Sequence, residues 1–172
     1  MVEVERLIRD IPDFPKKGII FKDISPLLSD GPALERAIAA MAKPYANAEI
    51  ECVVGIESRG FIFGMGVALS LGCGFVPVRK PGKLPNKTVS QTYNLEYGTD
   101  TVEIHVDALE AGQRVVVVDD VLATGGTMQA TCQLIHKLNA SIIGVSFLME
   151  LSFLRGREKL STVESITSLL TY

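Results

Sequence analysis

The chain has 172 residues, 47% of them hydrophobic and 22% charged, which is typical of a globular domain with a sizeable core and excludes a disordered chain. Its net charge of −3 gives no reason to expect binding to nucleic acid. The three cysteines, Cys52, Cys73 and Cys132, have neither disulfide-framework nor metal-ligand spacing, which favours a reducing, cytoplasmic location. The charged first ten residues differ from a signal peptide.

The N-terminal part of the chain predicts two helices separated by a loop. Apolar residues recur at helical spacing through residues 2–10, and Pro12 ends this pattern. Residues 14–21 are a loop and a short apolar run, which predict an arm packed on the core. Asp30 as N-cap and Pro32 in the first turn begin a second helix, which reaches about Lys43.

Two strand–helix–strand units follow. The predicted strands are 51–56, 75–78, 114–118, 142–149 and a closing strand at 163–170. The predicted helices are 60–71, 126–138 and a turn or short helix at 154–160. Alternation of this kind predicts an α/β fold, namely a doubly wound, mainly parallel sheet flanked by helices, with right-handed crossovers.

Residues 61–78 contain no charge, and this length is close to the minimum for a membrane-spanning helix. Several residues that break helices interrupt the stretch, namely Gly64, Gly66, Gly72, Gly74 and Pro77. We therefore expect a buried helix followed by a buried strand, and no membrane partner.

A different kind of segment separates the two units. Residues 79–86 are basic and broken by prolines and a glycine, while residues 87–95 and 101–106 alternate polar and apolar side chains. Together they predict a two-stranded excursion over residues 80–106. A connection of this length in a compact domain is typical of a lid or a binding loop.

The end of the valine strand carries the strongest candidate site. Asp119 and Asp120 follow four valines, at the carboxyl end of a predicted parallel strand, where α/β sheets place their ligands. The turn 124–127 (Thr-Gly-Gly-Thr) then supplies backbone N–H groups and hydroxyls at a helix start, which favours an anion. Carboxylates suited to hydroxyl groups beside an anion-binding turn predict a sugar phosphate as ligand.

A second polar turn, 57–60 (Glu-Ser-Arg-Gly), follows another predicted strand. Arg59 can hold phosphate oxygens in a bidentate fork, although an arginine at a helix start can equally have a structural partner. The next loop contains a basic cluster, which is either a solvated surface or an electrostatic guide for a polyanion. Its members are Arg79, Lys80, Lys83 and Lys87.

Other kinds of site fit less well. A P-loop needs a lysine after its second glycine, and none follows Gly126. The Gly64-Met65-Gly66 pattern of a dinucleotide site lies within a predicted helix and lacks a third glycine. His105 and His136 stand beside no nucleophilic serine or cysteine at a recognisable spacing, so neither is expected to be a catalytic base.

The segment VVVVDDVLATGGT at 115–127 resembles the phosphoribosyl-diphosphate signature of the type I phosphoribosyltransferases. Further segments, in order along nearly the whole chain, resemble the adenine phosphoribosyltransferases of that family: FP at 14–15, GIIFKDISPLL at 18–28, IESRGF at 56–61, RK and GKLP within 79–85, Tyr93 with LEYG at 95–98, and GR and KL within 156–160. The resemblance implies the type I phosphoribosyltransferase fold as one domain over 1–172, with a small N-terminal hood (1–30) and a mobile two-stranded lid (80–106).

The resemblance also implies roles for individual residues. Ribose 5-phosphate binding falls to Asp119, Asp120, Ala123, Thr124, Gly125, Gly126 and Thr127. Diphosphate binding falls to Glu57, Ser58, Arg59, Gly60, Arg79, Lys80 and Lys83, with a cis peptide after Glu57. Adenine binding falls to Ile20, Phe21 and Lys22, where Lys22 replaces an expected arginine. Catalysis falls to Arg59 and to Glu96, which contacts adenine and manages its proton.

The implied reaction transfers the 5-phosphoribosyl group from 5-phosphoribosyl 1-diphosphate to N9 of adenine, giving AMP and diphosphate. The implied cofactor is Mg²⁺, held mainly by diphosphate oxygens and water, with no dedicated protein metal site. The implied assembly is a homodimer. Two alternatives stay open, namely a transferase for another purine such as hypoxanthine, guanine or xanthine, and a non-catalytic regulator that binds phosphoribosyl diphosphate through the same motif.

Overall fold

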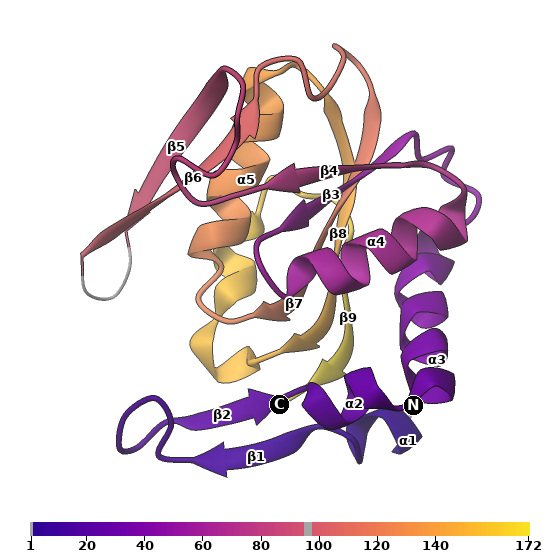
Figure 1. The fold of residues 1–172 in the computed structure, drawn as a ribbon, viewed down its shortest axis with the longest axis vertical. Helices are drawn as coiled ribbons and strands as arrows, with labels where there is room; N and C mark the ends of the chain where they lie inside the picture. The colour runs from indigo at the N-terminus through magenta and orange to yellow at the C-terminus, as the bar shows by residue number, and fades with distance from the viewer. Residues whose placement is uncertain (1, 95–97) are drawn as a thin grey trace.

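The computed structural model describes residues 2–94 and 98–172 (Figure 1). Its centre is a five-stranded sheet in the order β4-β3-β7-β8-β9, in which all neighbouring strands are parallel. The strands are β3 (Cys52–Ile56), β4 (Gly74–Val78), β7 (Arg114–Leu122), β8 (Ser141–Glu150) and β9 (Ile166–Thr171). The predicted α/β class, the parallel sheet and its five strands are confirmed.

Helices cover both faces of the sheet (Figure 1). One face packs against α5 (Gly126–Lys137), and the other packs against α3 (Gly31–Ala42) and α4 (Gly60–Leu71). Along β7 the valines alternate, since Val115 and Val117 join the core beneath α5 while Val116 and Val118 join the core beneath α3 and α4. This burial on both faces is what a continuous valine run predicts.

The predicted beginning of α3 is confirmed in detail, because the Asp30 side chain accepts a hydrogen bond of 2.9 Å from the Ala33 N–H. At its other end α3 continues into the short helix η1 (Lys43–Tyr45). The uncharged stretch 61–78 divides as expected, since α4 is capped by Gly72 at φ +70° and β4 begins at Gly74. In the described part of the chain, no helix has the length and apolar character needed to span a membrane.

The N-terminal residues form a small antiparallel hairpin with two short helices, and Val4, Ile24 and Leu27 of this segment join the core beneath α3 and α4, as expected for an arm packed on the core. We keep the name hood for residues 1–30. Its hairpin consists of β1 (Arg9–Pro12) and β2 (Ile20–Asp23), flanked by the short helices α1 (Val2–Glu5) and α2 (Ser25–Ser29). The predicted helix over residues 2–10 is therefore wrong beyond Glu5. An isolated helix of this length has little stability of its own, whereas β1 forms an antiparallel ladder with β2.

The two-stranded excursion is present as the antiparallel pair β5 (Thr88–Asn94) and β6 (Thr99–His105), which packs beside α5 (Figure 1). Lys137 of α5 donates a 2.8 Å hydrogen bond to the Ser90 carbonyl and fixes this packing. Glu96 lies outside the described residues. Movement of the hairpin as a lid stays a prediction.

Strand β7 is longer than expected, because its pairing with β8 continues from Asp119 opposite Phe147 to Leu122 opposite Glu150. The two aspartates therefore lie within the last residues of the strand rather than after it. The predicted turn or short helix before β9 consists of two 3-10 helices, η2 (Ser152–Leu154) and η3 (Gly156–Leu160).

Candidate active site

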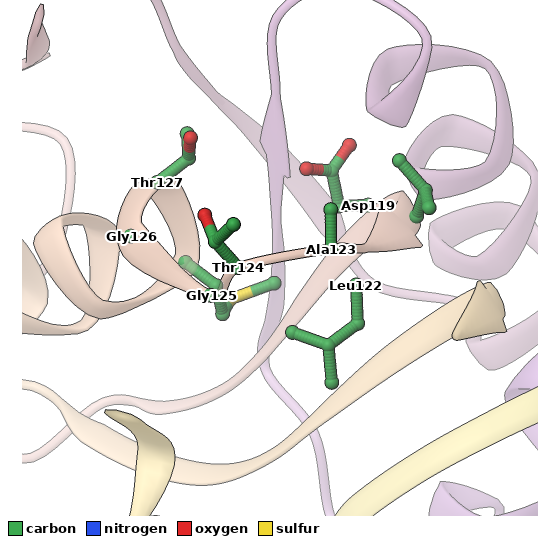
Figure 2. Close-up of a pocket in the computed structure, with 9 residues that line it drawn as sticks. Asp119, Leu122, Ala123, Thr124, Gly125, Gly126 and Thr127 are labelled. Carbon is green, nitrogen blue, oxygen red and sulfur yellow. The ribbon is translucent and has the colours of Figure 1, made fainter. Parts of the chain in front are cut away.

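The end of β7 and the start of α5 enclose a cavity of about 150 Å³. Figure 2 shows the Asp119 carboxylate and the Thr124 and Thr127 hydroxyls on the same side of the connecting loop. Gly125 is the N-cap of α5 at φ +77°, a conformation that glycine adopts without strain. The lining residues are Asp119, Val121, Leu122, Ala123, Thr124, Gly125, Gly126, Thr127 and Met128. The predicted anion-binding turn is thus a concave surface at a helix start.

The backbone of the C-terminal segment supports this phosphate loop. A Cβ atom at Gly125 would lie 2.4 Å from the Gly156 carbonyl oxygen, and one at Gly156 would lie 2.3 Å from the Ala123 carbonyl oxygen. Backbone therefore packs directly on backbone, and a side chain at either glycine would displace the loop. The sequence marked Gly156 through the resemblance but gave it no role.

The two aspartates have different surroundings. Asp119 lines the cavity, whereas Asp120 is 4% exposed and its Oδ2 lies 2.8 Å from Arg59 Nη2, without hydrogen-bond geometry. Burial, followed by the charge of Asp120, raises the pKa of Asp119 well above its ordinary value. Burial also raises the pKa of Asp120, against the opposing effect of Arg59. Such a pair favours partners that donate hydrogen bonds, such as the hydroxyls of a ribose.

The turn 57–60 lies against this pair of aspartates. A Cβ atom at Gly60 would lie 2.6 Å from Asp119 Oδ1 and 3.1 Å from Asp119 Cα, so the glycine permits direct packing. The peptide bond between Glu57 and Ser58 is cis, as the resemblance implied. The structure thus brings together the two polar turns that the sequence placed on separate strands.

The Glu57 carboxylate contacts three residues of the basic loop, namely Arg79, Lys80 and Lys83. It accepts hydrogen bonds from Arg79 Nε at 3.3 Å, Arg79 Nη2 at 3.2 Å, Lys83 Nζ at 2.5 Å and the Lys80 N–H at 3.0 Å. Burial acts to raise the pKa of Glu57, but Lys83, the Lys80 N–H and Arg79 outweigh it and lower the pKa to about 2. Glu57 is therefore ionised, and its direct partners are the cations assigned to the diphosphate.

A second, mainly apolar cavity of about 440 Å³ adjoins the phosphate loop and shares Thr124 with the first. Its lining residues are Gly18, Ile19, Ile20, Lys22, Thr124, Leu151, Phe153, Leu154 and Tyr172. Two of the three predicted adenine residues, Ile20 and Lys22, line it. The third, Phe21, has its ring centroid 5.0 Å from the Arg59 guanidinium carbon.

Six lining residues were not among the predicted site residues. Gly18 and Ile19 adjoin the predicted Ile20, and the other four are Leu151, Phe153, Leu154 and Tyr172. These four lie far along the chain from the hood, and no local motif marks them as part of a pocket. Lys22 connects the hood with the C-terminal residues, because its Nζ lies 2.7 Å from Asp10 Oδ1 in the hood and 3.7 Å from the ring centroid of Tyr172. The lysine in place of the expected arginine thus links the hood to the end of the chain.

The Mg²⁺ that the resemblance implies prefers oxygen ligands and retains several waters. Among residues 2–94 and 98–172, no group of three or more His, Cys, Asp or Glu side chains is placed to hold a metal ion. The cavity nevertheless offers oxygen donors, since the Asp119 carboxylate and the Thr124 and Thr127 hydroxyls line it. This donor set fits a metal that takes most of its ligands from a substrate and water.

Comparison with known proteins gives one consistent family. Residues 27–166 match the model of the phosphoribosyl transferase domain. An adenine phosphoribosyltransferase of Thermobifida fusca is 56% identical over 94% of this chain and 92% of its own length. The crystal structure of adenine phosphoribosyltransferase from Thermoanaerobacter pseudethanolicus is 51% identical with a TM-score of 0.96, covering 99% of both chains. That from Saccharomyces cerevisiae, complexed with an imino-altritol bisphosphate and adenine, is 40% identical with a TM-score of 0.88, covering 96% of this chain and 95% of its own.

Proposed function

The chain belongs to the adenine phosphoribosyltransferase family of phosphoribosyl transferase domain proteins, and from this premise we propose that it carries out purine salvage. It transfers the 5-phosphoribosyl group of 5-phosphoribosyl 1-diphosphate to N9 of adenine, giving AMP and diphosphate. One observation carries the proposal: a polar cavity at a helix start adjoins an apolar cavity, and Thr124 lines both. A ribose 5-phosphate joined at C1′ to a flat purine fits this arrangement.

The phosphate loop holds the sugar phosphate. Backbone N–H groups and hydroxyls of residues 123–127 donate to the 5′-phosphate at the positive end of α5. Asp119 and Asp120 accept hydrogen bonds from the ribose 2′- and 3′-hydroxyls. Because Gly60 packs against Asp119, the sugar is held next to the turn that binds the leaving group.

The reaction breaks the C1′–O bond with oxocarbenium character while N9 of adenine attacks the opposite face. Negative charge grows on the diphosphate, and hydrogen-bond donors and cations held next to this group stabilise the transition state. These donors come from the turn 57–60 and from Arg79, Lys80 and Lys83, whose positions Glu57 fixes. Mg²⁺, when bound to the diphosphate, neutralises part of its charge.

Adenine enters the apolar cavity between the hood and the C-terminal segment. Ile20 and Lys22 contribute one wall, and Leu151, Leu154 and Tyr172 contribute the other. Glu96 contacts adenine and manages its proton. Closing the hairpin over the site excludes water that would otherwise hydrolyse the cation.

We also propose a homodimer. Helix α4 is apolar on every side, yet Ile62, Met65 and Leu69 are 41%, 45% and 75% exposed along one stripe. A helix that is apolar all round is normally buried, so a second subunit on this stripe explains its composition. Because α4 begins at Gly60, the partner would lie beside the diphosphate turn. Sedimentation of wild type as a dimer and of Leu69→Lys as a monomer would support this interface, while a wild-type monomer would contradict it.

We propose a cytoplasmic location because the cysteines of the chain are free thiols. Burial raises the pKa of Cys52 to about 11 and that of Cys132 to about 12, which keeps both protonated, and the three cysteines are free. Free thiols fit a reducing compartment. The net charge of −3 favours small-molecule substrates over nucleic acid as partners.

The direct test mixes the protein with phosphoribosyl diphosphate, Mg²⁺ and adenine, hypoxanthine or guanine in turn, and measures nucleotide and diphosphate. Formation of AMP from adenine, with far slower reaction of the 6-oxo purines, is expected. The site must tell an amino donor from a carbonyl acceptor at one position of the base, and such differences discriminate strongly. IMP or GMP as main product would favour the other purine transferases, and no nucleotide from any base would favour the regulator.

A further inference from the structure

The hydroxyl of Tyr93 joins three parts of the site that are separate in the sequence. It accepts hydrogen bonds from Thr127 Oγ1 at 3.0 Å and from Lys80 Nζ at 3.2 Å, and it donates one to Asp100 Oδ2 at 3.2 Å. Lys80 also forms an ion pair with Asp100. Thr127 belongs to the phosphate loop, Lys80 to the basic loop, and Asp100 to the hairpin.

Tyr93 is also packed against the phosphate loop. It is 9% exposed, and a Cβ atom at Gly126 would lie 3.2 Å from its ring. Burial disfavours the charged forms of Lys80 and Asp100. Their pairing with each other outweighs burial, so that the pKa of Lys80 is raised and the pKa of Asp100 is lowered. Tyr93 pairs with Asp100 next to the turn of the hairpin. This end of the hairpin therefore rests on the phosphate loop through a buried tyrosine ring and a half-buried, hydrogen-bonded ion pair.

The direction of these hydrogen bonds depends on what Thr127 contacts. A threonine hydroxyl has one proton, and in the structure Thr127 donates it to Tyr93. A phosphate dianion can only accept hydrogen bonds. A 5′-phosphate on the loop therefore accepts the hydrogen bond that the Thr127 hydroxyl otherwise donates to Tyr93. The Thr127 oxygen can then only accept a hydrogen bond from Tyr93. The Tyr93 hydroxyl turns to donate to Thr127 and no longer donates to Asp100. Both acceptors of Lys80, the Tyr93 oxygen and the Asp100 carboxylate, lose a competing donor, so both bonds to Lys80 strengthen.

We propose that Tyr93 is a positioning residue that couples occupation of the 5′-phosphate site to the ordering of Lys80, and thereby to diphosphate binding. Lys80 has three donor protons, so two hold it in place and the third is presented to the diphosphate. A cation that is already ordered loses less conformational entropy on binding, and the coupling is therefore favourable. The identity of the two ligands rests on the proposed function.

The test measures coupling between two ligands that together span the substrate. Calorimetry gives the Kd of ribose 5-phosphate, the Kd of diphosphate with Mg²⁺, and the Kd of diphosphate in saturating ribose 5-phosphate; the ratio of the two diphosphate values is the coupling factor. Wild type should bind diphosphate more tightly when ribose 5-phosphate is present. Tyr93→Phe keeps the ring and should lower the factor about threefold or more. Tyr45→Phe removes another buried hydroxyl, which donates to the Val145 carbonyl, and should leave the factor unchanged.

An unchanged factor in Tyr93→Phe, or no coupling in wild type, overturns the role of Tyr93 while leaving the proposed function in place. Wild-type protein that binds neither ligand overturns both. If Tyr93→Phe melts at a much lower temperature than Tyr45→Phe, the coupling factor is measured in Asp100→Asn in its place. Asp100→Asn retains the Tyr93 ring and removes the carboxylate that orders Lys80. The factor must then fall in Asp100→Asn, and an unchanged value there also overturns the proposal.

Discussion

Replacing Glu57 by glutamine should strengthen diphosphate binding while weakening the fold. The carboxylate pairs with Arg79 and Lys83, two of the cations assigned to the leaving group, and accepts from the Lys80 N–H. A diphosphate must therefore compete with Glu57 for these groups or bind close to its negative charge. Glutamine has nearly the same shape without the charge, so the competition is removed. Only its amide oxygen can still accept from Arg79, Lys83 or the Lys80 N–H, which is why the fold is weakened.

The size of the stability loss and of the gain in affinity follows from the pKa of Glu57, which the structure lowers from 4.5 to about 2. At about 1.4 kcal/mol per pKa unit this is equivalent to about 3 kcal/mol. The Lys83 side chain is 48% exposed and that of Arg79 33%, and solvent weakens such pairs. We therefore expect about 1–2 kcal/mol of lost stability at neutral pH, and diphosphate affinity about 5–30-fold tighter.

The stability loss has a defined pH dependence. A carboxylate whose pKa is lowered by folding stabilises the protein above its unfolded pKa, and this contribution is lost as the pH falls from 4.5 toward about 2. The difference in unfolding free energy between wild type and Glu57→Gln should shrink over that interval. Denaturant unfolding at several pH values measures it, with Glu3→Gln, which loses an exposed pair with Arg36, as the charge-matched control.

Calorimetric titration with diphosphate measures the second effect at neutral pH. Tighter binding by Glu57→Gln and unchanged binding by Glu3→Gln are expected. If Glu57→Gln binds diphosphate more weakly, the carboxylate orders the cations for the ligand and does not compete with it, and the reasoning is refuted. Equal affinity would show that the diphosphate does not approach Arg79 and Lys83 at all.

Further variants test other parts of the site. Asp119→Asn combined with Asp120→Asn should abolish turnover while circular dichroism shows a folded protein; retained activity would rule out the ribose clamp. Glu96→Gln should lower kcat far more than it weakens binding of phosphoribosyl diphosphate, and equal losses would contradict its acid–base role. Gly156→Ala brings a Cβ atom to 2.3 Å from a phosphate-loop carbonyl, so stability should fall by about 1–3 kcal/mol and KM for phosphoribosyl diphosphate should rise. Gly74→Ala, which meets nothing within 4 Å, is its control, and equal effects in both would exclude loop displacement.

Features that depend on neighbours in the sequence were predicted well. The valine run of β7 needs burial on both faces wherever it lies, and the Asp30 cap contacts a residue three positions away. The turn 124–127 carries its own N–H groups and hydroxyls, so its chemistry is visible before its position is known. For these elements the local pattern and the fold agree.

Features that depend on distant partners were not predicted from pattern alone. Residues 2–10 have helical spacing, yet Arg9–Pro12 pairs with β2 instead, because a ladder contributes more than a short exposed helix. The apolar cavity is lined by residues as distant in the sequence as Ile20 and Tyr172, and no sequence pattern near Leu151 or Tyr172 predicts that either lines a cavity. Similarly, Glu57 lies 22 residues from Arg79, and the sequence offers many other carboxylates as partners.

The internal pairing of the cations bears on which anions the site can bind. Arg59 pairs with Asp120, Arg79 and Lys83 pair with Glu57, and Lys80 pairs with Asp100. An anion therefore gains only the difference between its own contacts and those that it replaces. A monophosphate has too little charge to offset several replaced pairs, whereas a diphosphate reaches several cations at once. We therefore expect the carboxylates that hold the basic groups in place to favour the diphosphate over inorganic phosphate at the proposed site.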